Sequence, residues 1–582
     1  MELRSRRWLD GDDEVALANR AALAPAARGA RGPVIGIANS ASDLNPCNLP
    51  LRQLAGAVAR GVREAGGIPA EFPTISLGED LMKPSAMLYR NLLAIEIEEM
   101  IRSHPLDGIV LLANCDKTVP GAVMGAASAD IPTVLVTGGA RAPATFRGRR
   151  IGTGTDLWRL WDERRTGDLD DAGWRELERC LAAGIGSCNT MGTASSMAIL
   201  CEALGLMIPG ASTIPAGDPR GTAAAAEAGR CAVAAVRDGI RPSQIMTAAA
   251  FRNAIRVLHA IGGSTNAVIH LTAMAGRVGA AFSLNDLERY GSGVPVLADV
   301  EPSGAGLIQD FDAAGGLPAL LRELSPLLEP AARTVAGPTI GEVIAAAPVK
   351  GEWSGTGRRV GGGGVIRPLS SAAAAGAGGA FAVVRGSLAP DGAVIKTSAA
   401  TPGLLRHRGP AVVFRGYEDM RRRVEDPALE VTPDSVLVLG GCGPVGAGMP
   451  EWGMIPIPAK LAAAGVRDMV RVTDARMSGT SFGTVFLHVA PEAAVGGPLA
   501  LVRDGDMISV DAAAGVLDLD VGADELARRR AAWSAPTSPH LRGWPALYRA
   551  HVTQAPDGCD LDFLTAPTAA HRRFVEPVVG RS

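Results

Sequence analysis

The sequence feature that most limits the fold is an alternation of short apolar runs with helix-like segments in the first part of the chain. Residues 33–38, 108–113 and 131–136 have the length and composition of buried strands. Between them, residues 51–64 and 85–101 carry apolar side chains at helical spacing. This alternation predicts an α/β domain with a parallel, doubly wound sheet and helices on both faces. Ligands bind such sheets beyond the carboxyl ends of the strands.

The second part of the chain has a different pattern of apolar and polar residues. A Gly- and Ala-rich segment at residues 351–379 has few large apolar side chains that could pack into a core, and its composition is typical of a linker. After it come short β-like runs separated by turns, among them residues 381–386, 411–416 and 485–490. At 582 residues the chain is too long for one ordinary domain. We therefore expect an N-terminal doubly wound α/β domain over residues 1–375 and a C-terminal β-rich, barrel-like domain over residues 376–582.

Charge and composition exclude several classes of protein. The 57 Lys and Arg residues nearly balance 60 Asp and Glu residues, so the chain has no basic field for nucleic acid. No apolar run reaches the roughly 18 residues that a membrane-spanning helix needs. The first 14 residues lack the apolar stretch of a secretion signal. Eight irregularly spaced cysteines indicate reduced thiols. We expect a cytoplasmic protein that binds neither nucleic acid nor membrane.

Three cysteines differ from the other five. Cys47, Cys115 and Cys188 each lie among Gly, Pro, Asn or Asp at an expected junction of elements. The segments around Cys47 and Cys115 follow two of the expected strands, where a ligand site is predicted. Taken alone, the three residues are compatible with unrelated thiols or with a shared metal or cluster.

Sequence segments around these cysteines, and others farther along the chain, resemble those of a known protein family. The segments are NPCN, NCDKTVPGAVMGAASADIP, GSCNTMGTASSM, IGGSTNAVIHL, GMPEWGMIPIP and VTDARMSGTSFGTVFLHVA. In this order the chain resembles the dihydroxy-acid and sugar-acid dehydratase family over nearly its whole length. The resemblance implies a [2Fe-2S] cluster, a Mg²⁺ ion and a homodimer or homotetramer. It also implies the elimination of water from a 2,3-dihydroxy carboxylate, which gives a 2-keto-3-deoxy acid.

The resemblance assigns roles to individual residues. It implies that Cys47, Cys115 and Cys188 hold the cluster and that Mg²⁺ is held by Glu79, Asp116, Lys117 and Glu451. Three cysteines would leave one iron an open position for the leaving hydroxyl, which suits catalysis better than electron transfer. Lys117 can serve as an oxygen ligand only if CO₂ has carbamylated it. Lysine is rare in this chain, so a lysine next to Asp116 is itself an indication of a functional role.

The resemblance also implies the base. Ser478 matches the position that the family uses as an alkoxide, and Thr480 is placed to hydrogen-bond the substrate. The run SGTS is equally typical of a helix N-cap, and the two interpretations are compatible. Asp474 and Arg476 are expected to orient this turn. His259 and His270 are expected to be core histidines whose hydrogen bonds are satisfied.

The segment at residues 78–92, GEDLMKPSAMLYRNL, is similar to that of pentonate and hexonate dehydratases, such as those that act on L-arabinonate or D-xylonate. The predicted substrate is therefore an anionic sugar acid. Two alternatives stay open. A branched-chain 2,3-dihydroxy-acid dehydratase would turn over 2,3-dihydroxy-isovalerate, and a non-catalytic iron–sulfur carrier or sensor would need no Mg²⁺. A structural protein built on Ala- and Gly-rich helices would leave the loop cysteines unexplained.

Overall fold

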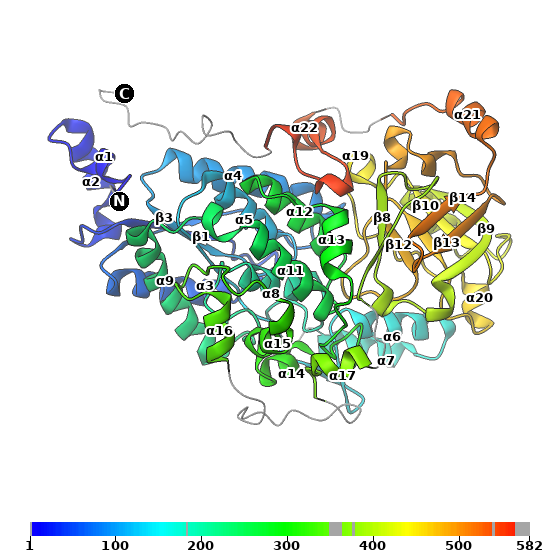
Figure 1. Cartoon of the computed structure of the whole chain (residues 1–582), viewed down its shortest axis with the longest axis horizontal. Helices are drawn as coiled ribbons and strands as arrows, with labels where there is room; N and C mark the ends of the chain where they lie inside the picture. Colours follow the sequence, from blue (N-terminus) through cyan, green and yellow to red (C-terminus); the bar gives the residue numbers. More distant parts are fainter. Residues whose placement is uncertain (1–2, 182–183, 348–363, 375–378, 538–541, 565–582) are drawn as a thin grey trace.

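The computed structural model describes residues 3–181, 184–347, 364–374, 379–537 and 542–564. An α/β region formed by the first part of the chain lies beside a β-rich region formed by the last part (Figure 1). Most of the predicted linker at residues 351–379 lies outside the described residues, and within its described part Leu369–Ala374 forms helix α17. The predicted boundary at residue 375 also lies outside them.

The first region contains a parallel sheet of four strands in the order β2-β1-β3-β4. Its strands are β1 (Val34–Asn39), β2 (Ile68–Pro73), β3 (Gly108–Leu112) and β4 (Thr133–Val136). The three predicted strands are confirmed to within two residues. The sequence pattern missed β2, because Pro69 and Pro73 interrupt it. Proline is tolerated there because β2 is an edge strand.

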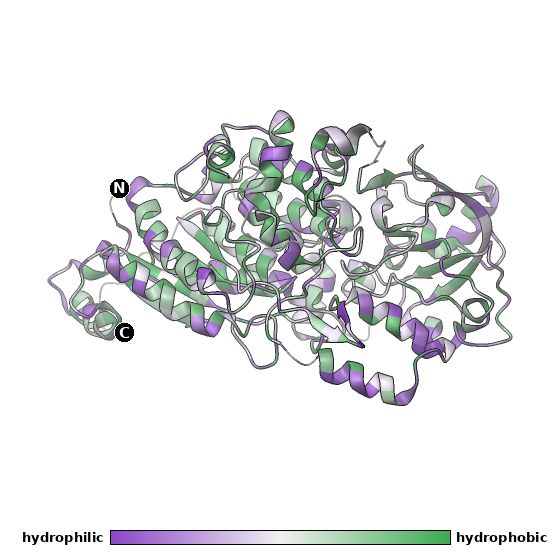
Figure 2. Ribbon diagram, turned by 90° about the horizontal axis from the view of Figure 1, so that it is seen from below, coloured by the Kyte–Doolittle hydropathy of each residue, from purple (hydrophilic) through white to green (hydrophobic). Residues whose placement is uncertain are grey.

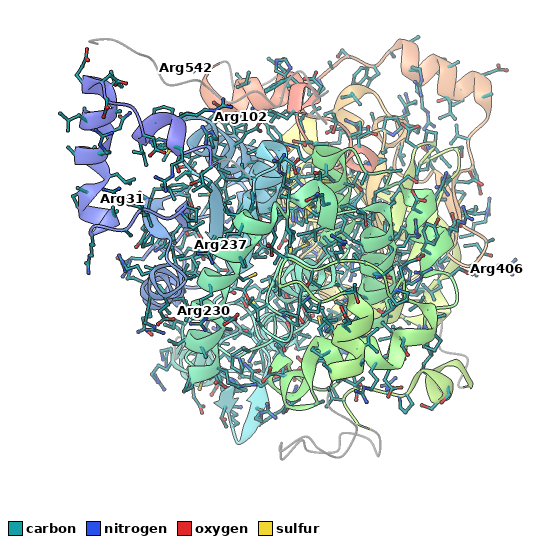
Figure 3. All side chains as sticks on the ribbon, turned by 60° about the vertical axis from the view of Figure 1, so that its left-hand side comes forward. Arg31, Arg102, Arg230, Arg237, Arg406 and Arg542 are labelled. Atoms are coloured by element: carbon teal, nitrogen blue, oxygen red, sulfur yellow. The ribbon has the colours of Figure 1, made fainter. Side chains whose placement is uncertain are left out.

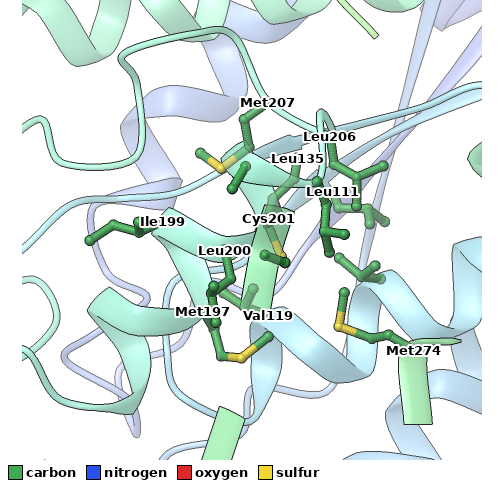
Figure 4. Packing of buried hydrophobic residues seen from close by; sticks show 14 of the residues in the cluster. Leu111, Val119, Leu135, Met197, Ile199, Leu200, Cys201, Leu206, Met207 and Met274 are labelled. Atoms are coloured by element: carbon green, nitrogen blue, oxygen red, sulfur yellow. The ribbon is translucent and has the colours of Figure 1, made fainter. Parts of the chain in front are cut away.

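Helices cover both faces of this sheet. A Cβ atom at Gly108 would touch Val236 of α9 (Pro219–Asp238). Leu111, three residues on and so on the opposite face, lies in a buried cluster with Val119 of α5 (Thr118–Ala129) and Cys201 of α8 (Thr193–Ala203) (Figure 4). The predicted doubly wound α/β domain is therefore confirmed.

The helices of each face pack closely through small residues. A Cβ atom at Gly61 of α3 (Leu51–Glu64) would lie 1.9 Å from the carbonyl oxygen of Ala226 in α9. On the other face, a Cβ atom at Gly125 of α5 would lie 2.4 Å from the carbonyl oxygen of Ala94 in α4 (Arg90–Ser103). Any larger residue at either glycine would push the two helices of that face apart. The predicted helix at residues 51–64 is confirmed, and residues 85–101 form the 3₁₀ turn Ala86–Tyr89 followed by α4.

The second region is an eight-stranded mixed sheet in the order β14-β13-β9-β10-β11-β12-β8-β7. Its strands are β7 (Ala382–Val384), β8 (Gly392–Ile395), β9 (Arg406–Arg415), β10 (Val436–Gly440), β11 (Arg471–Thr473), β12 (Val485–Ala490), β13 (Met507–Asp511) and β14 (Val516–Leu519). Strands β9 to β12 run parallel. A parallel bridge between Arg385 and Val516 links the two ends of the sheet. The sheet is thus a nearly closed barrel, as predicted.

The other described elements surround these two sheets. They are α1 (Arg6–Leu9), α2 (Glu14–Ala27), β5 (Ala144–Phe146), β6 (Arg149–Ile151), α6 (Thr155–Thr166), α7 (Asp171–Leu181), α10 (Pro242–Ile245), α11 (Ala248–Ala260), α12 (Asn266–Val278), α13 (Leu284–Gly291), α14 (Ile308–Ala313), α15 (Gly316–Leu324), α16 (Ile340–Ala346), α18 (Tyr417–Arg423), α19 (Pro444–Ala447), α20 (Ala459–Ala463), α21 (Ala523–Ala531) and α22 (Gly543–His551). Hydrophobic residues predominate in the inner strands, while many hydrophilic residues lie on the outer helices and the outermost strands (Figure 2). No helix among the described residues has both the length and the apolar character to cross a membrane.

The two regions share buried contacts. Val383 and Val394 of the barrel belong to the main core cluster of the first region. After α22 the chain returns to the α/β region, where Arg90 donates hydrogen bonds to the carbonyl oxygens of Gly558 and Cys559 at 2.8 and 2.9 Å. The loops that carry the predicted site residues lie at this junction.

Candidate active site

The strand order of the α/β sheet changes direction between β1 and β3, and the loops after these two strands carry the first two predicted cysteines. Asn48 ties the loops together, because its Oδ1 accepts hydrogen bonds from the backbone N–H groups of Asn114 and Cys115 at 3.2 and 3.0 Å. In return, Asn114 Nδ2 donates to the carbonyl oxygen of Cys47 at 2.7 Å. The Cys47 and Cys115 side chains meet, and the Cys47 thiol together with burial raises the pKa of the Cys115 thiol.

The third predicted cysteine lies on a loop that joins the other two. Gly186, two residues before Cys188, donates its N–H to the carbonyl oxygen of Pro46 at 3.0 Å. Burial, together with the neighbouring Cys47, raises the pKa of the Cys188 thiol to about 12. All eight cysteines are free thiols. The structure therefore brings together the three cysteines that the sequence set apart.

A lysine lies among the predicted oxygen ligands. Lys117 is fully buried, and its Nζ lies 3.0 Å from Glu451 Oε1 and 3.5 Å from Glu79 Oε2. Its Nζ also contacts the neighbouring Asp116 carboxylate. Glu79 comes from the loop after β2, Asp116 and Lys117 from the loop after β3, and Glu451 from the barrel. All four predicted Mg²⁺ ligands thus meet at one point.

Arg476 is a second buried cation at this point. Its guanidinium donates from Nη1 to Glu451 Oε1 at 3.0 Å and from Nη2 to Ser85 Oγ at 3.0 Å. Ser85 Oγ in turn donates to Glu79 Oε1 at 2.8 Å. The sequence predicted only that Arg476 supports the Ser478 turn, whereas its side chain links carboxylates from both regions. Other arginines, such as Arg230 and Arg406, lie at the surface (Figure 3).

The charges of this group explain its pKa shifts. Burial alone would raise the pKa of Glu451, but Lys117 and Arg476 bring it down to about 2. Burial dominates at Glu79, whose pKa is raised despite the nearby Lys117. For Lys117, burial and Arg476 act to lower the pKa, but the surrounding carboxylates raise it overall. A charged ammonium therefore stands among the carboxylates at neutral pH.

Ser478 lies in a turn between β11 and β12, next to the same network. A Cβ atom at Gly479 would lie 2.6 Å from the backbone nitrogen of Thr193, the first residue of α8. Asn266 connects this point to the carboxylates, since its Nδ2 donates to Thr193 Oγ1 and to Glu451 Oε1, both at 2.9 Å. No helix begins at SGTS in the described chain, so the N-cap interpretation is wrong. The helix start near Ser478 is that of α8.

The other expected supports fall elsewhere. The Asp474 carboxylate accepts hydrogen bonds from the backbone N–H groups of Gly441, Cys442 and Ala493, so it fixes loops of the barrel. His259 and His270 are buried, as expected, but they are not satisfied. Both ring nitrogens of His259, and Nε2 of His270, have no hydrogen-bond partner among the described residues.

Sequence reasoning assigned no role to the polar residues that hold the site together. These are Asn48, Ser85, Asn114 and Asn266. Three of them stand inside segments that carry the resemblance, and Ser85 stands in the segment at residues 78–92 from which a sugar-acid substrate was predicted. An uncharged polar residue among apolar neighbours was the available signal, but it gave no indication of the partner.

Comparisons with known proteins identify the family of the chain. Residues 32–343 match the dihydroxy-acid/6-phosphogluconate dehydratase N-terminal family, and residues 364–559 match the corresponding C-terminal family. The chain belongs to this dehydratase family. It is therefore an enzyme of the hydro-lyase class, as the sequence predicted.

The relatives that are similar to this chain are named for different substrates. The chain is 47% identical to the 6-deoxy-6-sulfo-D-gluconate dehydratase of Pseudomonas putida, over 98% of this chain and 97% of that protein. It is 45% identical to the L-arabinonate dehydratase of Rhizobium leguminosarum bv. trifolii, over 97% and 96% of the two chains. It is 38% identical to the dihydroxy-acid dehydratase of Moorella thermoacetica, over 91% and 94%.

The side chains can be compared with the groups that the family resemblance implies. Within the described residues, no three His, Cys, Asp or Glu side chains form a ready set of metal ligands. The chemistry of the donors nevertheless fits. Three thiols stand together, and burial opposes the ionisation of the Cys115 and Cys188 thiols unless a metal supplies positive charge. Beside them, carboxylate oxygens surround a point that already holds the cationic Lys117 Nζ.

Proposed function

We propose that the protein dehydrates a sugar acid to the corresponding 2-keto-3-deoxy acid. The favoured substrates are aldonates, either a pentonate such as L-arabinonate or D-xylonate, or a hexonate. Identities of 45% and 47% to two sugar-acid dehydratases, against 38% to a dihydroxy-acid dehydratase, support this choice. The observation that carries the proposal is the meeting of Cys47, Cys115 and Cys188 with a buried group of acidic residues beside Ser478.

We infer that the three cysteines hold a [2Fe-2S] cluster and that Glu79, Asp116 and Glu451 hold Mg²⁺. When bound, these groups supply positive charge that helps the C3 hydroxyl to leave and that stabilises the substrate carboxylate and C2 hydroxyl. Lys117 completes the oxygen set if its amine is carbamylated. Carbamylation would replace the cation among the carboxylates with an oxygen donor, which suits a site that takes a divalent cation instead.

The residues of the chain supply the proton transfer. Ser478 Oγ, as an alkoxide, takes the C2 proton; the C–H electron pair becomes the C2–C3 double bond, and the C3 hydroxyl leaves. The resulting enol then becomes the 2-keto acid. Arg476, two residues from Ser478 in the chain and fully buried, holds a fixed positive charge on the Glu451 carboxylate of the same site. Thr480 is placed to contact the substrate.

The proposal extends to the location, the oligomeric state and the partners of the enzyme. We infer a cytoplasmic enzyme that works as a homodimer or homotetramer, without nucleic-acid or membrane partners. The near balance of 57 basic and 60 acidic residues supports the absence of a nucleic-acid partner. Reduced thiols are needed for cluster binding, and all eight cysteines are free.

The test is a substrate screen with anaerobically purified protein supplied with Mg²⁺. The panel contains L-arabinonate, D-xylonate, D-gluconate, 6-deoxy-6-sulfo-D-gluconate and 2,3-dihydroxy-isovalerate, and the readout is formation of 2-keto acid. We expect the highest kcat/KM with an aldonate and an activity that a chelator abolishes. Preferred turnover of 2,3-dihydroxy-isovalerate would establish the branched-chain alternative. A cluster with reversible redox behaviour and no turnover of any substrate would point to the carrier or sensor.

A further inference from the structure

The first turn of α6 holds the turn that carries Ser478. Thr155 Oγ1 donates a hydrogen bond to the carbonyl oxygen of Thr480 at 2.9 Å, and Trp158 Nε1 donates to Thr480 Oγ1 at 3.2 Å. A Cβ atom at Gly154 would lie 2.6 Å from Thr480 Oγ1, and one at Gly192 would lie 2.9 Å from Thr480 Cγ2. The Thr480 side chain is therefore confined between two glycines and held by residues of the α/β region.

The hydrogen bonds of Thr480 have a definite direction. Thr480 Oγ1 lies 3.0 Å from Ser478 Oγ, and on geometry alone either hydroxyl could donate. The indole N–H of Trp158 can only donate, so Thr480 Oγ1 accepts from it and its own proton must find another partner. Thr480 is 5% exposed, and among the described residues Ser478 Oγ is the one acceptor that its hydroxyl reaches. A buried hydroxyl proton without an acceptor is costly, so Thr480 donates to Ser478.

We propose that Trp158 is a positioning residue for proton removal from the substrate: by donating to Thr480, it directs the Thr480 hydroxyl onto Ser478 Oγ. The Ser478 oxygen then receives hydrogen bonds from the Thr480 hydroxyl at 3.0 Å and from the Thr480 backbone N–H at 3.4 Å. Hydrogen bonds donated to an oxygen favour its anionic form. The inference rests on the proposed function, in which Ser478 is the base.

The proposal also gives Thr480 a specific part. Its single proton is committed to Ser478, so toward a substrate hydroxyl it can act only as an acceptor. Trp158 acts through Thr480 and does not touch the base itself. Removing the indole N–H should therefore weaken proton abstraction but leave substrate binding intact.

The test compares variants of the cluster-loaded enzyme with Mg²⁺ and the aldonate that the screen selects. Trp158→Phe keeps the aromatic ring and removes the donor; we expect kcat to fall about 10-fold at unchanged KM. The rising limb of its kcat–pH profile should move to higher pH, because the Ser478 hydroxyl becomes harder to ionise. Trp161→Phe is the matched control, since Trp161 is on the same helix, 44% exposed and packed on Trp174, and it should behave as the wild type.

A double-mutant cycle separates this role from general damage to the fold. Thr480→Val removes the hydroxyl with little change of shape and should lower kcat by about 10- to 100-fold, while Thr480→Ser should retain most of it. If Trp158 acts through Thr480, the double variant Trp158→Phe/Thr480→Val is no slower than Thr480→Val alone. Independent, multiplying losses would overturn the proposal. If Trp158→Phe does not fold, the comparison of Thr480→Val with Thr480→Ser still tests the hydrogen bond that Thr480 donates to Ser478 Oγ.

The control Ser478→Ala distinguishes this inference from the function on which it rests. If Ser478→Ala keeps turnover, the assignment of the base fails and the role of Trp158 fails with it. If Ser478→Ala is inactive while Trp158→Phe has the kcat and pH profile of the wild type, the base stands and only the inference about Trp158 is overturned.

Discussion

Lys117 donates a hydrogen bond from Nζ to Glu451 Oε1 over 3.0 Å, and this contact joins residues 334 positions apart in the chain. Lys117 is the N-cap residue of helix α5 in the α/β region, while Glu451 lies in a loop of the barrel. The carboxylate group around Lys117 is therefore complete only when the two regions are packed together. The same contact places a buried positive charge where three carboxylates meet, which makes Lys117 important for stability as well as for the proposed chemistry.

The first prediction concerns the charge of Lys117. In chelator-treated protein, Lys117→Met should lower the free energy of unfolding by about 3 kcal/mol, because it removes a buried cation from this group of carboxylates and leaves Arg476 to neutralise them. Lys460→Met is the control; Lys460 is exposed and donates to the carbonyl oxygen of Pro427 at 3.2 Å, and its loss should cost about 0.5 kcal/mol or less. Denaturant unfolding measures both. Equal effects of the two substitutions would show that Lys117 does not neutralise the carboxylates.

The second prediction concerns Cys188. Cys188→Ser should abolish the visible absorbance of the cluster and turnover together, because a serine hydroxyl is a poor substitute for a thiolate at iron. Cys180→Ser is the control, since Cys180 lies in α7 and is absent from the group formed by Cys47, Cys115 and Cys188. It should keep both properties. Retention of the full spectrum by Cys188→Ser would remove this residue from the ligand set.

The third prediction concerns the base. Ser478→Ala should keep the visible absorbance, because Ser478 is not a proposed ligand, and should lower kcat by about 100-fold or more. Anaerobic absorbance spectra and steady-state assays of 2-keto acid formation measure the two effects. If the coloured variant keeps most of its turnover, another group removes the C2 proton.

The sequence predicted the parts of the fold that rest on local patterns. Buried strands such as β3 are continuous apolar runs, and α3 shows its apolar face at helical spacing, so both can be read without the structure. Strand β2 could not be predicted, because its prolines remove the local signal and only pairing with β1 makes it a strand. Strand β14 was also not predicted, because it has only four residues and its pairing with β13 fixes its place.

Sequence resemblance selected residues of the candidate site that lie together in the structure, but it did not predict the contacts between them. The resemblance selected Cys47, Cys115 and Cys188, and the structure places them together. By contrast, the role of Arg476 depends on Glu79 and Ser85, residues far from it in sequence that only the packed domains bring near. The hydrogen bond from Trp158 to Thr480 likewise joins residues 322 positions apart. Contacts of this length leave no local trace in composition or periodicity.

The last prediction concerns pH and His488. Burial, with Arg476 nearby, lowers the pKa of His488 to about 3, against an ordinary value of 6.5. Because the folded pKa is depressed, the unfolded chain takes up the proton first as the pH falls below 6.5. Stability is therefore present above that pH and is lost progressively toward pH 3. Between pH 7.5 and 5.5 this one residue should cost about 1.4 kcal/mol.

His488→Asn removes the titrating group and suits the backbone, because His488 has a φ of 61°, a left-handed conformation that asparagine tolerates better than most residues. The free energy of unfolding should therefore fall less between pH 7.5 and 5.5 in this variant than in the wild type, by about 1.4 kcal/mol. His259 contributes equally to both proteins and cancels in the comparison, and burial, the largest cause, holds the pKa of His270 well below 6.5 in both. Urea unfolding at the two pH values gives the difference, and identical pH dependence of the two proteins would mean that His488 is not held neutral by the fold.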